Sequence, residues 1–184
     1  YVLSQNEKAI TTRGGFMEAD GPHIMDLDMI SGNLDGLSEE AGILLSEQTA
    51  KALFGDSDPI NQSVEVYYEF SMIVKGVFKD LPINSSFHDV RFVGSWDFFV
   101  SSQPWMQKSI ERKNWHNNSY QLFAQLAENA TMDAVSQKIL RVKQENISTE
   151  EQKADNKIIL HPMKDWHLRS KWENGVKSGG LIQY

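Results

Sequence analysis

Residues 43–60, with the sequence ILLSEQTAKALFGDSDPI, combine a strand signal, a helix signal and a stop signal without a spare residue. The apolar run at 43–45 is of strand type, and the hydroxyl of Ser46 can cap the helix that follows. Gly55 can adopt the left-handed conformation that ends a helix. We therefore expect a helix over 47–54, followed by a new strand.

The same periodicity selects a hydrophobic core. Ala50, Leu53 and Phe54 lie at helical spacing and form one apolar face. A Leu53→Ala change at a fully packed site costs about 2 to 5 kcal/mol. Our expected buried positions are Ala50, Leu53, Phe54, Val74, Val77, Leu122, Ile139 and Leu140.

The rest of the first half also follows an α+β pattern. Short runs rich in β-branched and aromatic residues are typical of strands. We expect such strands at 9–13, 63–68, 71–78 and 89–94, with a turn near Glu69. Ser95 is expected to cap a helix over 96–102 that stops near Pro104. Residues 108–118 are polar and aromatic and indicate an exposed loop or a junction between lobes.

The second half indicates a strand, a helix and a second strand. Residues 120–126 alternate between apolar and polar side chains, which is the pattern of a half-buried strand. Thr131 is expected to cap a helix over 132–146, and 157–160 reads as a strand. The expected fold class is therefore α+β, with a mixed-sheet lobe that contains a βαβ crossover plus a second, smaller lobe.

Composition excludes several classes of protein. The 184 residues, 40% of them hydrophobic, suffice for one domain or two small lobes, and the sequence contains no cysteine. It has no apolar run near the ~20 residues that a bilayer span needs. A net charge of −7 without a Lys/Arg cluster argues against nucleic-acid binding. Without a phosphate-cradling glycine motif, we expect the chain neither to bind nor to hydrolyse nucleotide.

Four ordered segments resemble the MacB-like periplasmic core domain, which is the extracytoplasmic part of FtsX-type ABC transporter permeases. The similar segments are DMISGN at 28–33, the opening segment at 43–60, IVKGVFKDLPINSSF at 73–87 and LHPMKDWHLRS at 160–170. The resemblance covers about 22–184. One departure is Asn61, which stands where a glycine is usual.

The resemblance implies a non-catalytic domain, spanning 1–184 and porter-like in its βαβ lobe, on the periplasmic side of the bacterial inner membrane. It implies transmembrane helices on both sides of this segment in the same chain and a cognate cytoplasmic ATPase. A permease dimer is also compatible with it, as is a peptide, lipoprotein or drug substrate. The implied mechanism couples ATPase-driven movement of the membrane helices to export or mechanotransmission outside the membrane. It implies no cofactor.

Residue clusters that could carry chemistry are better explained as structural. His161, Asp165 and His167 offer zinc ligands, but their spacing fits neither a helical nor a strand pair. The remaining groups lack the motif that their chemistry needs. They are Gly14 with Gly15, Gly179 with Gly180, the carboxylates Asp20, Asp26, Asp28 and Asp35, the pairs Glu39–Glu40 and Glu150–Glu151, and Ser85 with Ser86. We assign no catalytic, cofactor-binding or metal-binding residue.

Aromatic content supports an alternative from another class, a secreted carbohydrate- or protein-binding module. Exposed tryptophans stack on sugars or anchor partner proteins. Of Trp96, Trp105, Trp115, Trp166 and Trp172, we expect Trp105 and Trp115 to be the exposed ones. The two hypotheses differ in the flanking sequence, since a permease requires an apolar stretch of ~20 residues soon after Tyr184. Tyr184 would then suit the aromatic belt at the bilayer surface.

Overall fold

The computed structural model describes residues 1–112, 115, 119–154, 157–166, 168–173 and 176–180. The chain divides into two compact units, 1–113 and 114–184, and each is described by itself. None of the described helices has the length and apolar character of a membrane span. The C-terminal residues 181–184, on which the expected approach to a membrane helix depends, lie outside the described residues.

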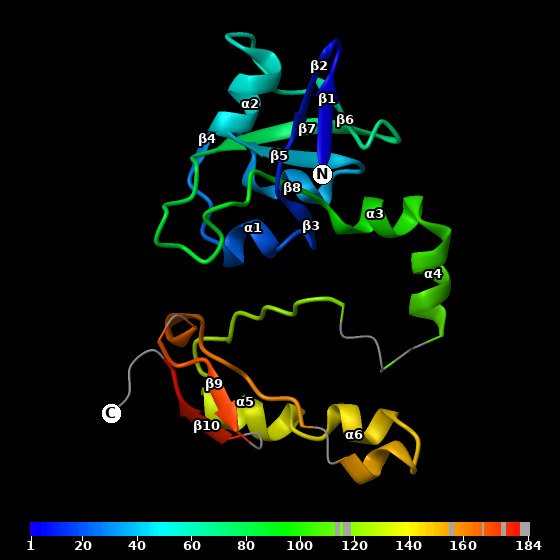
Figure 1. Ribbon diagram of the computed structural model, residues 1–184, viewed down its shortest axis with the longest axis vertical. Helices are drawn as coiled ribbons and strands as arrows, with labels where there is room; N and C mark the ends of the chain where they lie inside the picture. Colours follow the sequence, from blue (N-terminus) through cyan, green and yellow to red (C-terminus); the bar gives the residue numbers. More distant parts are fainter. Residues whose placement is uncertain (113–114, 116–118, 155–156, 167, 174–175, 181–184) are drawn as a thin grey trace. The chain divides into compact units, whose positions relative to one another are not determined.

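A mixed sheet organises the first unit (Figure 1). Its eight described strands are β1 (Val2–Gln5), β2 (Lys8–Thr11), β3 (Gly15–Met17), β4 (Met29–Gly32), β5 (Gly42–Ser46), β6 (Ser63–Val66), β7 (Phe70–Phe78) and β8 (Phe92–Ser95). The order across the sheet is β2-β1-β6-β7-β5-β8-β3, and β4 pairs with the second half of β7. The pairs β5–β7 and β3–β8 are parallel and the others are antiparallel.

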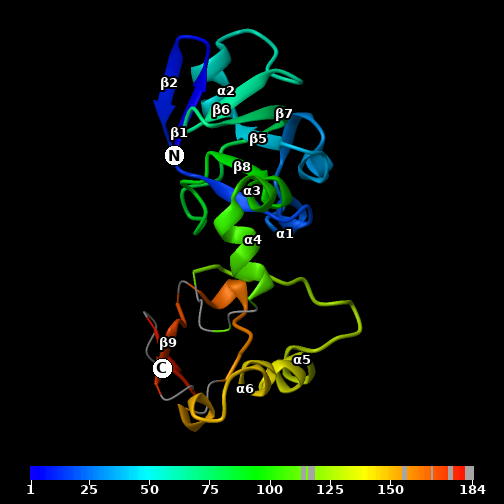
Figure 2. The same cartoon turned by 90° about the vertical axis from the view of Figure 1, so that its right-hand side faces the viewer.

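The helices of this unit are short. They are α1 (Gly21–Ile24), the 3-10 helix η1 (Leu34–Ser38), α2 (Glu47–Phe54), α3 (Trp96–Ser102) and α4 (Pro104–Glu111). Helix α2 packs on β1, β2, β5 and β7, whereas η1 contacts β5, β7 and β8 (Figures 1 and 2). Both faces of the central strands are therefore covered.

The helix predicted over 47–54 is confirmed at both ends. The Ser46 hydroxyl accepts a hydrogen bond of 3.4 Å from the Thr49 amide, which satisfies one free N–H of the first turn. Gly55 has a φ of +66° and its amide donates to the Lys51 carbonyl at 2.9 Å. Since β5 and β7 are parallel neighbours, the path through α2 and β6 is a crossover of the βαβ kind, with one extra strand.

The buried side chains form two clusters on opposite faces of the sheet. In β5, Ile43 and Leu45 belong to the α2-side cluster and Leu44 belongs to the other, as the alternation of a strand requires. The first cluster also contains Ala50, Leu53, Phe54, Val74 and Val77, so these five core predictions are confirmed. The second contains Leu27, Leu37, Leu44, Phe78 and Val93.

A break in register at Lys75 shifts which side chains of β7 face the α2-side cluster, from Met72 and Val74 before it to Val77 after it. Residue Ile43 pairs with Val74 but Leu44 pairs with Gly76, so β7 carries one extra residue there. The ammonium of this extra residue, Lys75, lies 2.6 Å from Glu39 Oε2. A β-carbon at Gly76 would lie 2.4 Å from Met29 Cε, so a larger residue at this position of β7 would displace the Met29 side chain.

Most of the strand and helix predictions for this unit are confirmed. The structure has strands within or close to 9–13, 63–68, 71–78 and 89–94, and α3 spans Trp96–Ser102 with Ser95 Oγ accepting from the Phe98 amide. Asn61 has a φ of +61°, so asparagine replaces the usual glycine in a conformation that it tolerates. The loop expected from residue 108 onward is wrong in part, because α4 begins at Pro104 and continues to Glu111.

The second unit has little regular structure. Its described elements are α5 (Met132–Ile139), α6 (Val142–Asn146), the 3-10 helices η2 (Glu151–Ala154) and η3 (Met163–Asp165), and the hairpin β9 (Lys171–Glu173) with β10 (Val176–Gly179). Thr131 caps α5 as predicted, since its Oγ1 accepts from the Ala134 amide at 3.2 Å. The α+β class with a mixed sheet is confirmed, but the sheet lies in the first unit and its crossover runs through α2.

The strands predicted at 120–126 and 157–160 are wrong. Both segments are irregular, and Leu122 is 95% exposed and not buried as expected. Alternation alone does not make a strand, because its backbone groups need a hydrogen-bonded neighbour, and no strand of the described residues pairs with either segment. The helix predicted over 132–146 is interrupted after Ile139, and the Leu140 carbonyl there accepts from the Ile158 amide at 3.2 Å. Ile139 and Leu140 are half-buried.

Candidate functional site

The loop that joins β7 to β8, residues 79–91, is held by several side-chain contacts. We call it the β7–β8 loop. The amide of Lys79 donates to the Asp28 carbonyl at 2.8 Å, and its ammonium contacts the Asp28 carboxylate at 2.6 Å. At the other end the Arg91 carbonyl accepts from the Ser46 amide at 2.8 Å. Both ends are therefore joined to the sheet region.

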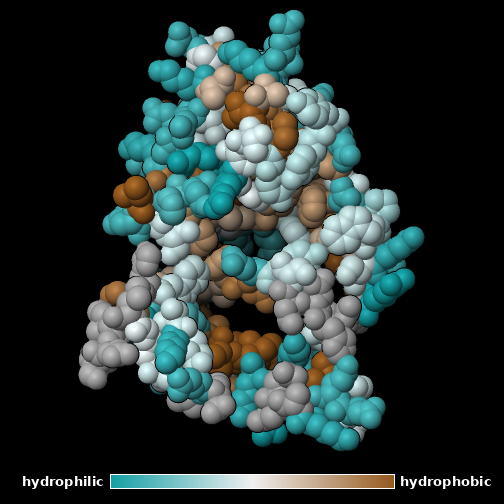
Figure 3. Space-filling model, in the orientation of Figure 1, coloured by the Kyte–Doolittle hydropathy of each residue, from teal (hydrophilic) through white to brown (hydrophobic). Residues whose placement is uncertain are grey.

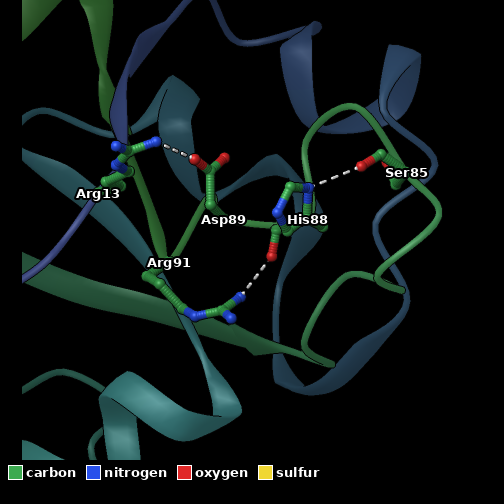
Figure 4. A network of polar contacts seen from close by, with 5 residues as sticks. All are labelled: Arg13, Ser85, His88, Asp89 and Arg91. Atoms are coloured by element: carbon green, nitrogen blue, oxygen red, sulfur yellow. Dashed lines mark hydrogen bonds and ion pairs between the residues drawn. The ribbon is translucent and has the colours of Figure 1, made fainter. Parts of the chain in front are cut away.

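Two arginines hold the second half of this loop (Figure 4). The guanidinium of Arg13 donates to Asp89 Oδ2 at 2.5 Å, which ties the loop to the segment between β2 and β3. The guanidinium of Arg91 donates to the His88 carbonyl at 2.9 Å and lies 3.8 Å from Asp80 Oδ1. The contact between Arg91 and Asp80 brings the start and the end of the loop together.

Hydrogen bonds within the loop fix its turn. The Ser85 hydroxyl accepts from the Phe87 amide at 3.2 Å, and the Ser85 carbonyl accepts from His88 Nδ1 at 3.0 Å. Leu81 and Val90 pack against the second core cluster. The loop is thus anchored by apolar side chains beneath and by polar contacts at its surface.

The tip of the loop presents an exposed apolar side chain. Ile83 is 90% exposed beside the exposed Pro82, whereas Leu81, Phe87 and Val90 are half-buried. Figure 3 shows apolar surface at the left margin of the molecule, where this loop lies in Figure 1. Because both ends of the loop are held, the backbone around Ile83 is already ordered, and a partner that binds there has to order less of the chain.

The ion pair with Arg13 changes the pKa of the Asp89 carboxyl in the β7–β8 loop. The hydrogen bond from the Arg13 guanidinium lowers the pKa of Asp89 below its ordinary value of 3.8. The carboxylate therefore remains charged, and its contact with Arg13 persists, at neutral pH.

His161 and Asp165, which were considered as zinc ligands and not assigned, lie in the second unit, and the described residues contain no group of three potential metal ligands. His161 packs edge-on against Trp172, with ring centroids 5.4 Å apart, and Asp165 lies 3.8 Å from Arg169. The third residue, His167, lies outside the described residues. Both ring nitrogens of His161 are buried and lack a hydrogen-bond partner among the residues that the structure describes.

The other candidates have structural environments. Asp28 pairs with Lys79 and Asp35 accepts from His23 Nε2 at 2.6 Å, so these carboxylates do not converge. Ser85 holds the turn of the β7–β8 loop. Gly14 allows close packing, since a β-carbon there would lie 2.3 Å from the Phe92 ring.

Tryptophan exposure agrees with expectation at one of two positions. Trp105 is 56% exposed on α4, and its indole N–H donates to Gln103 Oε1 at 2.9 Å. Trp115 is half-buried, so its predicted exposure is wrong. Trp166 lies against Phe123, with centroids 5.6 Å apart, and its indole donates to the His161 carbonyl at 3.3 Å.

Sequence reasoning missed the residues that hold the loop. Arg13 and Asp89 are far apart in sequence, and neither belongs to a motif that predicts their contact. The two tyrosines at the tip of the β6–β7 hairpin were also missed. The unusual Tyr67-Tyr68 sequence at a turn was the available signal, because such positions favour Asn and Gly.

Comparison with known proteins gives a consistent picture. The family model of the MacB-like periplasmic core domain matches residues 1–142. The fold is similar to a crystal structure of a domain described as part of a permease protein from Porphyromonas gingivalis, with a TM-score of 0.59 at 19% identity. It is also similar to the periplasmic region of MacB from Actinobacillus actinomycetemcomitans, with a TM-score of 0.54 at 12% identity.

The chain spans only part of the length of the solved structures that it matches. The alignments cover 81% and 85% of this chain, but 66% and 72% of the respective solved structures. The extracellular domain of YknZ, a noncanonic ABC-type transporter of Gram-positive bacteria, aligns over 55% of this chain and 52% of its own, with 20% identity and a TM-score of 0.42. No curated protein matches the sequence.

Proposed function

The chain belongs to the family of MacB-like periplasmic core domains, and on this premise we propose that it couples movement of membrane helices to work outside the membrane. The family places it on the extracytoplasmic side as a part of ABC transporter permeases. In the proposed mechanism a cytoplasmic ATPase of the same transporter closes and opens, the membrane helices of the permease transmit the movement, and this domain changes its contacts. The work is export or mechanotransmission.

The β7–β8 loop carries the proposal. A surface that transmits movement to a partner must keep its shape while it moves, and this loop is held by Arg13, Arg91 and two apolar anchors. It presents Ile83, whose exposed side chain suits an apolar contact with another protein or with a second permease chain. We assign the loop the role of a contact surface for a partner, a peptide, a lipoprotein or a drug.

We further propose that the domain is not an enzyme and uses no metal or cofactor. The polar groups of the loop support this, since the Ser85 hydroxyl and the His88 ring are engaged by the backbone of the loop itself. We treat residues 1–184 as one functional domain that moves as a part of the permease, although its contacts form two units.

Photo-crosslinking in the full-length permease with its ATPase tests this function. A benzoyl-phenylalanine replaces Ile83, and the matched control replaces Ser57, an exposed residue in the loop after α2. We expect the products from position 83 to differ between nucleotide-free and ATP-trapped transporter, and those from position 57 to stay the same. Identical products from position 83 in the two states would contradict coupling through this loop.

A further inference from the structure

The tip of the β6–β7 hairpin is built from two tyrosines in an unfavourable backbone conformation. We call Tyr67 and Tyr68 the tyrosine tip. Their φ angles are +56° and +60°, and the Glu69 amide donates to the Val66 carbonyl at 3.1 Å to close the turn. Turns with two such central residues favour Asn and Gly, because a β-carbon is crowded in the left-handed region.

Neighbouring structure holds the tip in this conformation. The Tyr67 amide donates to the Val2 carbonyl of β1 at 2.8 Å, and its ring packs on Tyr1 with centroids 5.2 Å apart. Register pairs on both strands continue up to Val66 and Phe70. The strained turn is therefore imposed by the sheet, which is the situation in which strain indicates a functional position.

The strained turn exposes two aromatic side chains to solvent. Tyr67 is 48% exposed and Tyr68 is 65% exposed. Tyr67 packs on Tyr1, but burial in this chain's own core does not explain the exposed ring of Tyr68, and tyrosine is a preferred anchor in protein interfaces.

Charge next to the tip selects the partner. Glu65 and Glu69 flank the tyrosines and are exposed. Exposed aromatic rings flanked in the sequence by two carboxylate residues suit a guanidinium or an ammonium, which can stack on a ring and pair with a carboxylate. The same carboxylates disfavour an anionic membrane surface.

We propose that the tyrosine tip binds a cationic, arginine-containing segment of a partner protein. The inference rests on the hairpin alone and does not depend on the proposed coupling function. It assigns this partner site to the β6–β7 hairpin, and so to elements other than the β7–β8 loop.

Binding to a defined probe tests the proposal. A fluorescein-labelled peptide of alternating arginine and glycine is titrated with the 184-residue chain, and anisotropy is measured in low and in physiological salt. We expect saturable binding in the range of about 0.01 to 1 mM that weakens with salt. A peptide with glutamate in place of arginine should not bind.

Variants separate the role of the ring from the role of the backbone. Tyr68→Gly removes the ring and relieves the turn, so we expect affinity to fall about tenfold while the melting temperature rises by about 2 to 4 °C. Tyr68→Phe keeps the ring and should retain binding, and Glu65→Gln with Glu69→Gln should weaken it. Trp105→Gln, which removes an exposed aromatic elsewhere in the first unit, should leave binding unchanged.

Three results would overturn the proposal. One is full binding by Tyr68→Gly, and another is a fall in its melting temperature, which would show that Tyr68 is present for stability. The third is tyrosine-dependent binding to vesicles containing phosphatidylglycerol without binding to the arginine peptide, which would assign the tip to a membrane surface.

Discussion

Replacing Leu53 with alanine tests the packing of the first unit directly. The side chain is 1% exposed and lies in the α2-side cluster, between α2 and the sheet. Removing its buried carbons loses their transfer free energy and leaves a cavity, for a total of about 2 to 5 kcal/mol. We expect about 3 to 4 kcal/mol, because α2 is fixed at both ends, by the Ser46 cap and at Gly55, and cannot easily move to fill the space.

Urea unfolding followed by circular dichroism measures the change in free energy of unfolding. Amide hydrogen exchange in β5, against which α2 packs, gives the same quantity locally. Gln48→Ala is the matched control, since Gln48 is exposed on the same helix and its replacement should change stability by less than about 0.5 kcal/mol. A loss below about 1 kcal/mol for Leu53→Ala would refute the assigned helix face.

Three further predictions follow from individual contacts. Ser46→Ala removes the cap of α2 and should lower the free energy of unfolding by about 1 kcal/mol in urea titrations, whereas Ser46→Thr should retain most of it. The hydrogen bond from Arg13 lowers the pKa of Asp89, so the pair should add stability above pH 3.8. This stability should be lost as the pH falls through the folded-state pKa of Asp89. Thermal melts between acid and neutral pH should show the loss in the wild type and not in Arg13→Gln. Burial raises the pKa of the Tyr1 hydroxyl above 10.0, and the nearby Tyr67 adds to the effect. The contribution of Tyr1 to the free energy of unfolding should therefore be complete below pH 10.0 and be lost as the pH rises above that value, and ultraviolet titration of tyrosinate can detect the shift.

Local signals predicted the local structure of the first unit well. The run from β5 through α2 was predictable because cap, apolar face and stop residue are all adjacent in sequence and agree with one another. The same holds for α3, whose cap Ser95 is the last residue of strand β8. In these segments, pairing in the sheet reinforces what the sequence favours locally.

Non-local contacts explain what could not be predicted. Residues 120–126 have the alternation of a strand, but no described strand forms a ladder with them, and only the folded arrangement reveals this. The ion pair of Arg13 with Asp89 joins segments that are distant in sequence, so neither segment alone predicts that the β7–β8 loop is held by it. Residues 73–87, one of the segments that carry the resemblance, lie within the matched range 1–142, but the resemblance did not indicate that this loop is fixed.

The position of β5 has a consequence for how the protein is made. This strand is buried along its whole length, and its two partners, β7 and β8, both come later in the chain. During synthesis its apolar residues and its free backbone groups stay unpaired until residues 73–78 and then 92–94 arrive. Such a segment is prone to aggregate, so the nascent chain must be kept from premature association until Ser95 has emerged.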